Sequence, residues 1–331
     1  MVFFGIVLYA SREQLSETRE LLANISLRGA LLLPLIQLAS YFFISGYYRS
    51  AIALFGKRLG VARTYGSTIA LNFVNQVLPS GGASGTTYMI YAFKDAAKPG
   101  QLTLIQLGRY LFGFITYVPL LITAFIWLMA SGDLNRQLEI ALGGLTLAAL
   151  PGTILILAAV RNQTLVDTVV IKLIGAANRA VRFFTRRPLG PLKVDKDRGF
   201  LKEFNSGVEF LRQQKGHLLV PYLYMQISTL LEVTLVNTAF GVLGAEVHPA
   251  AILVAFTAAN IAGAISIIPG DVGVHELAVI TTLSYIGVEP GTAIAGALLY
   301  RVFNKLIVMA VGFFCYLRMI KPLVDNAKSS P

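Results

Sequence analysis

The chain has 331 residues, of which 55% are hydrophobic and 14% are charged. Soluble domains usually carry about 25% charged residues, so this composition argues against a soluble enzyme and for a protein of the lipid bilayer. The net charge of +11 comes without zinc-ligand spacing or an aromatic–basic pattern, so we expect no nucleic acid as partner. Excess Lys and Arg are instead typical of cytoplasmic loops in membrane proteins.

Long apolar runs recur along the chain. A helix needs roughly 20 apolar residues to cross the hydrocarbon core, and continuous runs favour helices over the alternating strands of a barrel. We therefore predict an all-α, polytopic helical bundle that forms one transmembrane domain over residues 1–331. The runs cover residues 29–48, 102–130, 140–160, 218–243, 250–268 and 291–317.

The first half, residues 1–160, starts with an apolar stretch at 2–10 that is too short to span. We interpret it as the outer end of a first helix, short or truncated. Further along, basic residues flank residues 65–93 on both sides, which places both ends on the inner side. Gly and Ser residues break this segment directly after Pro79. Because irregular backbone at membrane depth needs cover from protein or water, we predict a re-entrant helical hairpin over 65–93.

The longest polar stretch, residues 161–217, predicts a cytoplasmic loop. Residues 159–216 hold twelve Lys and Arg but five Asp and Glu. This bias is typical of the cytoplasmic side, and we expect the basic tail, 318–331, to lie on that side too. We expect the protein itself to reside in the cell membrane. Apolar residues at helical spacing within 162–184 indicate an amphipathic helix on the inner leaflet, with a solvated connector as the alternative.

The second half, residues 218–317, holds a matching break. Loops poor in Lys and Arg flank residues 250–285, and Pro269 begins the break Pro-Gly-Asp-Val-Gly. This predicts a second re-entrant hairpin over 250–285 that enters from the opposite face. Each hairpin precedes a span with an arginine, Arg109 or Arg301. Such an order in two halves is typical of an inverted-topology repeat, and the breaks point to a transporter's binding site.

Polar residues within these apolar stretches are the candidates for the site. A charge at the bilayer centre costs about 2.5–3.5 kcal/mol, so it usually faces a cavity or a partner. Helix arms that restart after a break present free N–H groups to anions, and glycine lets a ligand approach the backbone. With Pro79 and Pro269 as the breaks, the expected substrate-binding residues are Asn72, Asn75, Ser80, Gly81, Gly82, Ser84, Arg109, Gly270, Asp271, Gly273, Glu276, Arg301 and Lys305.

Structural roles compete with these functional ones. Arg109 and Arg301 either line a polar site or lock helices together through ion pairs. Glu276 is either the partner of an arginine or a first-turn acid that stabilises its helix N-terminus. Glu232 stands alone in its span and is more typical of a structural pair, whereas His275 is more typical of a hydrogen-bonded structural histidine.

The sequence shows no nucleophile–base pair, metal-ligand cluster or nucleotide-binding loop. The Gly-rich segment 81–85 lacks the lysine of a P-loop and follows no predicted strand. We therefore expect no cofactor, no metal and no enzymatic activity of the chain itself.

Three segments resemble signatures of the lysylphosphatidylglycerol synthase transmembrane family, also called the flippase-like or UPF0104 family. They are NFVNQVLPSGG at 72–82, IPGDVGVHE at 268–276, and Tyr300-Arg301. The resemblance covers nearly the whole chain. It implies an all-helical domain that, in multidomain members, moves aminoacylated phosphatidylglycerol between leaflets, and it implies importance for the positions of Glu276, Arg109 and Arg301.

The chain departs from this family in two ways. Many members carry an arginine soon after the first Pro-Gly turn, where this chain has Thr86-Thr87-Tyr88, so headgroup contacts there are expected to differ. Only a short tail follows Leu317, so we do not expect the soluble aminoacyl-transferase domain of bifunctional members or its synthase activity.

The leading hypothesis is therefore a translocase for an anionic-headgroup or polyprenyl-linked lipid. One alternative is a non-transporting membrane subunit that presents lipid to a separate synthase or glycosyltransferase. Another is a secondary transporter of a small anion. Membrane lipids are the expected partners, and a lipid-modifying enzyme is a second candidate.

Overall fold

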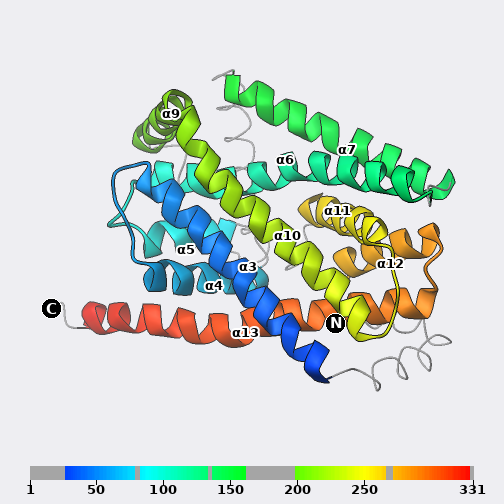
Figure 1. Cartoon of the computed structure of the whole chain (residues 1–331). Coiled ribbons are helices and arrows are strands. Elements are labelled where there is room, and N and C mark those ends of the chain that lie inside the picture. Colours follow the sequence, from blue (N-terminus) through cyan, green and yellow to red (C-terminus); the bar gives the residue numbers. More distant parts are fainter. Residues whose placement is uncertain (1–26, 79–82, 133–135, 162–197, 266–270, 329–331) are drawn as a thin grey trace. The chain divides into compact units, whose positions relative to one another are not determined.

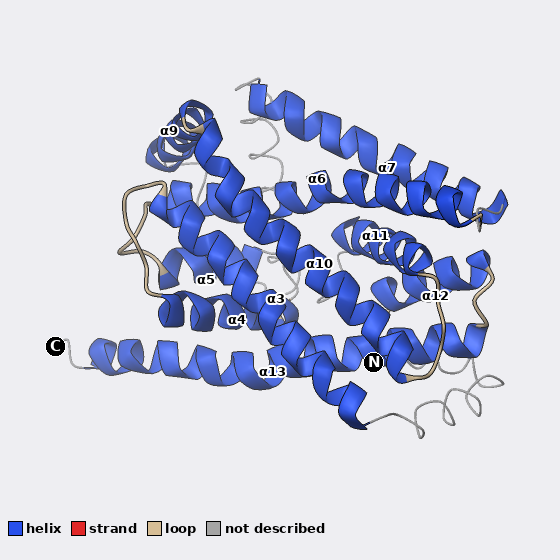
Figure 2. Cartoon of the chain, viewed as in Figure 1, coloured by secondary structure: helices blue, strands red, loops and turns tan. Residues whose placement is uncertain are grey.

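The computed structural model describes residues 27–78, 83–132, 136–161, 198–265 and 271–328, and every regular element in these ranges is a helix (Figures 1 and 2). The prediction of an all-α protein is therefore confirmed. The elements are α3 (Leu27–Ala53), α4 (Val61–Val77), α5 (Ala83–Ala92), α6 (Pro99–Ser131), α7 (Arg136–Arg161), α9 (Arg198–Gln213), the 3-10 helix η1 (Lys215–Leu218), α10 (Leu219–Val242), α11 (Pro249–Ile265), α12 (Val274–Ile286) and α13 (Pro290–Lys328).

Four of the described helices are long and apolar enough to cross a membrane, and each coincides with an apolar run that predicted a span. Large apolar side chains stay exposed on them, among them Leu35, Ile126 and Phe314 at 62%, 61% and 69%. Such surfaces suit contact with lipid rather than water. The chain is a multi-pass membrane protein, and the candidate spans among the described residues are Leu31–Ala53, Pro99–Ser131, Gly216–Val242 and Pro290–Arg318.

Local sequence sets where several helices begin. Proline opens α6, α11 and α13, at Pro99, Pro249 and Pro290. Proline suits this position because its missing N–H would have no partner in the first turn. At α13, the carboxylate of Glu289 also accepts two first-turn N–H groups, at 2.9 and 2.8 Å. These contacts satisfy donors that the helix itself cannot.

Two pairs of short helices lie on either side of the predicted breaks. Helix α4 packs against α5, and α11 packs against α12 (Figure 1). The breaks themselves lie outside the described residues, and with them Pro79, Ser80, Gly81, Gly82, Pro269 and Gly270. The structure thus contains the helix pairs expected at 65–93 and 250–285, while their re-entrant path and opposite orientation stay predictions.

The chain forms two compact units. The first unit takes Met1–Ser40, Gly113–Thr153 and Thr229–Leu306, and the second takes Tyr41–Phe112, Ile154–Ser228 and Ile307–Pro331. Each unit therefore combines three stretches that are separated along the chain. The predicted halves around a cytoplasmic loop remain predictions, and the amphipathic helix expected at 162–184 lies outside the described residues.

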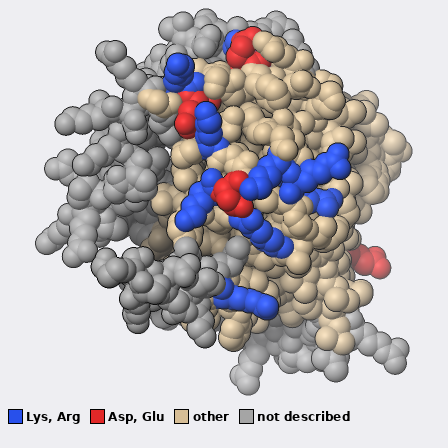
Figure 3. Space-filling model, turned by 90° about the vertical axis from the view of Figure 1, so that its left-hand side faces the viewer, with Lys and Arg blue, Asp and Glu red and all other residues tan. Residues whose placement is uncertain are grey.

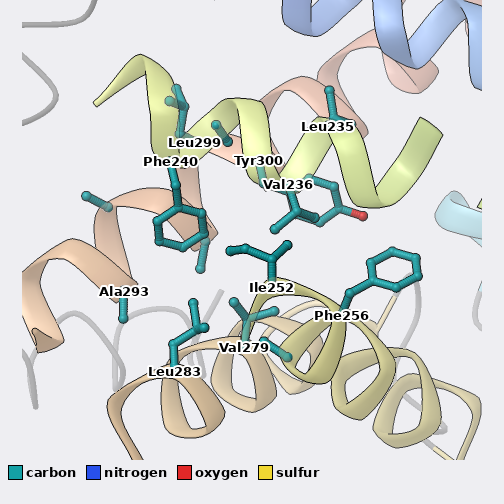
Figure 4. Packing of buried hydrophobic residues seen from close by; sticks show 14 of the residues in the cluster. Leu235, Val236, Phe240, Ile252, Phe256, Val279, Leu283, Ala293, Leu299 and Tyr300 are labelled. Atoms are coloured by element: carbon teal, nitrogen blue, oxygen red, sulfur yellow. The ribbon is translucent and has the colours of Figure 1, made fainter. Parts of the chain in front are cut away.

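In the first unit, the hydrophobic core lies where α10, α11, α12 and α13 meet (Figure 4). Phe240 of α10, Ile252 of α11 and Val279 of α12 are almost fully buried in it. Gly296 of α13 makes room for the Phe240 ring, because a Cβ at this position would lie 2.2 Å from a ring carbon. A small residue therefore allows α10 and α13 to approach closely.

Aromatic side chains fill the core of the second unit. Tyr47 and Tyr48 of α3 are buried, with ring centroids 5.2 Å apart, and Phe112 of α6 packs edge-on against Tyr47 at 6.0 Å. The hydroxyl of Tyr47 donates to the carbonyl of Ile105 in α6. The rings supply apolar area and their hydroxyls find polar partners, so α3 and α6 are joined in both ways.

We expect Gly296→Ala to destabilise the first unit by about 1–3 kcal/mol, because the new methyl group would overpack the Phe240 ring. Gly241→Ala in α10 is the matched control, since a Cβ there meets nothing within 4 Å. Thermal unfolding of both variants in detergent measures the difference. Equal melting temperatures for the two would contradict the close approach of α10 and α13.

Candidate functional site

The carboxylate of Glu276 in the first unit is bound on both of its oxygens. Its Oε2 accepts the backbone N–H of Gly273 at 2.7 Å, just before α12 begins. Its Oε1 accepts Nε of Arg301 in α13 at 2.6 Å. Both side chains are buried, 5% and 7% exposed. Glu276 therefore fills both roles considered for it, as partner of an arginine and as an acid at a helix N-terminus.

A second carboxylate, Asp271, extends this ion pair. Its oxygens lie 3.7 Å from Nη2 of Arg301 and 3.9 Å from Nζ of Lys305. Asp271 has a φ of 51°, a conformation that Asp adopts more readily than most residues. Gly263 of α11 leaves space for it, because a Cβ there would lie 3.0 Å from the Asp271 carboxylate. The chain before α12 thus directs two acids toward α13.

Glu232 of α10 is surrounded by neutral hydrogen-bond donors. Its Oε1 accepts Gln37 Nε2 at 2.9 Å and Ser40 Oγ at 2.8 Å, both from α3. Its Oε2 accepts Asn304 Nδ2 at 3.2 Å and, at 3.5 Å, the hydroxyl of Tyr300, both from α13. Among the described residues no cation lies within ion-pair distance of Glu232. The sequence favoured a structural ion pair for Glu232, but the structure surrounds it with four neutral side chains, which we call its cage: Gln37, Ser40, Tyr300 and Asn304.

Arg109 occupies a different environment, in the second unit. Its Nη1 donates to the hydroxyl of Tyr48 in α3 at 3.1 Å, and its Nη2 donates to Oδ1 of Asn72 in α4 at 3.2 Å. The guanidinium also lies 5.9 Å from the centroid of the Tyr48 ring. In the described part of the chain, no carboxylate comes within 4.0 Å of it. Within the described residues, Arg109 is therefore held by neutral oxygens and has no counter-charge.

Asn75 and Ser84 belong to the packing between α4 and α5. Oδ1 of Asn75 accepts the N–H of Gly85 at 2.9 Å, in the first turn of α5. A Cβ on Gly85 would lie 2.2 Å from the same oxygen, so only glycine allows this approach. Ser84 is buried, and its hydroxyl lies 3.5 Å from the Val74 carbonyl. Asn75 thus satisfies one of the free N–H groups that were expected to face an anion.

The two arginines follow the same sequence order but bind different partners. Each lies about three turns into a helix that begins Pro-Gly, α6 for Arg109 and α13 for Arg301. Arg109 contacts the helix before its break, whereas Arg301 contacts Glu276 in the helix after its break. The Pro-Gly start that α6 and α13 share is a further sequence signal of a repeat.

Several residues of these clusters were not singled out from the sequence. Gln37 and Ser40 are polar positions three residues apart in an apolar span, a spacing that places them on one face of α3. Tyr48 was read only as part of an apolar run. His275 lies under the Tyr300 ring, with centroids 5.5 Å apart, and its buried Nδ1 has no partner among the described residues.

A basic surface surrounds the loop between α5 and α6, in the second unit. Arg63 binds the Asp95 carboxylate through two hydrogen bonds, at 2.6 and 3.0 Å, and Lys57 lies 3.3 Å from it. Figure 3 shows Lys and Arg side chains gathered around acidic ones on one face of the molecule. Hydrogen bonding to Arg63 lowers the pKa of Asp95 well below its usual range.

These features define a class: a multi-pass helical membrane protein with broken helix pairs and charged groups inside its spans. The chain matches the family described as "Lysylphosphatidylglycerol synthase TM region" over residues 1–312. It therefore belongs to this family, as the resemblance of three segments indicated. No curated protein and no solved structure matches it. Membership in the membrane region of a lipid synthase family supports a lipid-related function in the membrane.

Glu276→Gln should destabilise the first unit by roughly 3–5 kcal/mol, because it removes the carboxylate closest to the buried Arg301 charge and leaves the longer contact with Asp271. Asp271→Asn should cost at most about 1 kcal/mol, since its side chain is one-third exposed and its contacts are longer. The double variant Glu276→Gln/Arg301→Gln should recover part of the loss. Denaturant unfolding in detergent tests this, and additive losses in the double variant would show that the pair is not coupled.

Asp95 should stabilise the second unit only while it is ionised. Its folded-state pKa is lowered, so the contribution is complete above its unfolded pKa of about 3.9 and is lost as the pH falls below that value. The pair is exposed, so we expect at most about 1 kcal/mol. The stability difference between the wild type and Asp95→Asn, followed by thermal unfolding, should stay constant from pH 7 to 5 and shrink below pH 4. A difference that grows on acidification would contradict this.

Proposed function

We propose that this protein moves an anionic-headgroup or polyprenyl-linked lipid between the leaflets, and that Arg109 contacts the headgroup phosphate. One observation carries the proposal: Arg109 lies inside a candidate span, yet neutral oxygens hold it and no described carboxylate neutralises it. A guanidinium pairs with phosphate through two parallel hydrogen bonds, and these are strong where water is scarce. An anion that arrives here would supply the missing counter-charge.

A lipid fits this position better than a free anion does. Its phosphate can reach an arginine inside the membrane while its chains stay in hydrocarbon, whereas a soluble ion must first lose its water. The family to which the chain belongs supports the same substrate class. Arg301 receives a different role, because Glu276 already compensates its charge. In this proposal Arg109 binds the ligand and Arg301 holds α12 against α13.

The remaining predicted residues also divide into those that support ligand binding and those that hold helices together. Asn72 orients Arg109, while Asn75 and Ser84 hold α5 against α4. We propose that the protein resides in the cell membrane. Its basic face around Asp95 and its C-terminus would then face the cytoplasm, because Lys and Arg collect on that side. A lipid-modifying enzyme as partner remains compatible with this arrangement.

Reconstitution in liposomes tests the proposal. Fluorescent phosphatidylglycerol is placed in both leaflets, and its loss of signal to a membrane-impermeant quencher reports exchange. Arg109→Gln should slow this exchange at least about tenfold, because a hydrogen bond to a charged group contributes about 1.5–3 kcal/mol and 1.4 kcal/mol is a factor of ten. Arg109→Lys keeps the charge but cannot form two parallel hydrogen bonds to a phosphate. Its exchange rate should lie between those of the wild type and Arg109→Gln.

Arg58→Gln is the matched control, because it removes an exposed arginine of the same unit. Its exchange rate should equal that of the wild type, and fluorescent phosphatidylcholine should exchange more slowly than phosphatidylglycerol. The proposal fails if folded Arg109→Gln exchanges anionic lipid at the wild-type rate, or if the wild type moves no anionic or isoprenoid lipid. Uptake of inorganic phosphate without lipid exchange would instead identify a transporter of small anions.

A further inference from the structure

Glu232 lies deep within a candidate membrane span. It is the only charged residue of α10, about 24 Å of helix after the span begins at Gly216 and about 15 Å before it ends at Val242. A carboxylate at such depth is costly and requires a reason. A fixed ion pair would be the usual structural solution, and among the described residues Glu232 has none.

The groups around Glu232 can serve either of its protonation states. Hydroxyls and carboxamides both donate and accept hydrogen bonds. Ser40, Tyr300, Gln37 and Asn304 therefore solvate a carboxylate as donors, and one of them accepts the O–H of a carboxylic acid after a bond rotation. Glu276 is the opposite case, because the guanidinium of Arg301 and a backbone N–H only donate. Its cluster suits the carboxylate alone.

The charge balance of the surrounding residues also favours a protonated Glu232. Helix α3 presents the neutral Gln37 and Ser40 to Glu232. Helix α13 presents the neutral Tyr300 and Asn304, with Lys305 acting on Glu232 electrostatically. Arg301, also in α13, binds Glu276. Asp271 and Glu276 compensate the two cations, while His275 stacks on the Tyr300 ring and lies in the field of both cations.

With a neutral His275, this cluster of three acids and two bases carries a net charge of −1. One proton on Glu232 makes the whole cluster neutral. Because an uncompensated charge is costly in a medium of low dielectric constant, proton binding removes the one charge of this cluster that has no ion-pair partner among the described residues.

We propose that Glu232 is a proton-binding site and that its protonation couples lipid movement to a proton gradient. The proposal rests on the proposed lipid exchange, and it assigns the driving ion. The proton enters as an O–H on the Glu232 carboxyl and leaves to the opposite side, with no other covalent change. Proton release restores the negative charge beside Lys305, which lies in the electrostatic field of both Glu232 and Asp271.

Infrared spectroscopy of the purified protein tests proton binding without any transport. The wild type should show the C=O stretch of a protonated carboxylic acid, and this band should titrate with pH. Glu232→Gln should lose the band, while Glu139→Gln, which removes an exposed carboxylate of the first unit, should keep it. A band that persists in folded Glu232→Gln overturns the proposal, as does a wild type with no titrating band.

Proteoliposomes test the coupling. A pH gradient should accelerate exchange of fluorescent phosphatidylglycerol at least about fivefold in the wild type, and leave Glu232→Gln, which mimics the protonated form, unchanged within a factor of two. Acceleration by a sodium gradient at constant pH, lost in Glu232→Gln, would overturn the proton in favour of sodium. A wild type that exchanges lipid with no response to the pH gradient would overturn coupling while leaving the proposed lipid exchange intact.

A second variant guards against misfolding of Glu232→Gln. Ser40→Ala removes one hydrogen bond to the carboxylate and keeps the side-chain volume nearly unchanged, so the titration midpoint of the infrared band should move away from its wild-type value. Ser50→Ala, on the same helix, removes hydrogen bonds to two backbone carbonyls and none to Glu232, so it should leave the midpoint in place. An unchanged midpoint in Ser40→Ala would show that the titrating acid is not Glu232.

Discussion

The ion pair between Glu276 and Arg301 is the contact on which the first unit depends. It fastens α12, a helix that restarts after a break, to the long span α13, and its second oxygen satisfies an N–H group that the restart leaves free. Hydrocarbon offers no solvent for either group, so the protein must supply both partners itself. Asp271 and Gly263 fit around the pair, and the packing of α11 against α12 keeps them in place.

The two units use one motif for different purposes. Each has a helix pair around a break, followed by a span that begins Pro-Gly and carries an arginine. In the first unit the arginine is neutralised, which favours a rigid joint. In the second unit Arg109 is held by Tyr48 and Asn72 and keeps its charge. Under the proposed function, the segment of the first unit supports structure and the segment of the second unit faces the ligand.

Spans, breaks and intramembrane arginines were readable from the sequence because each is a local pattern. Twenty apolar residues suffice for a span, and Pro with Gly suffices for a break. The partners of the charged residues were not readable, because they lie far apart along the chain. Gln37 and Glu232 are separated by 195 positions, and Arg301 and Glu276 by 25. Only packing of whole helices decides that Glu232 meets amides and hydroxyls while Arg301 meets a carboxylate.

The cage around Glu232 also constrains how the protein is made. Its donors come from α3, near the start of the described chain, and from α13, near its end. When α10 enters the membrane during synthesis, α3 can already offer Gln37 and Ser40, but Asn304 and Tyr300 do not yet exist. The carboxyl must therefore cross into the bilayer incompletely solvated, and the arrival of α13 completes its shell. Completion of this hydrogen-bond shell is thus tied to α13, which supplies two of its four donors.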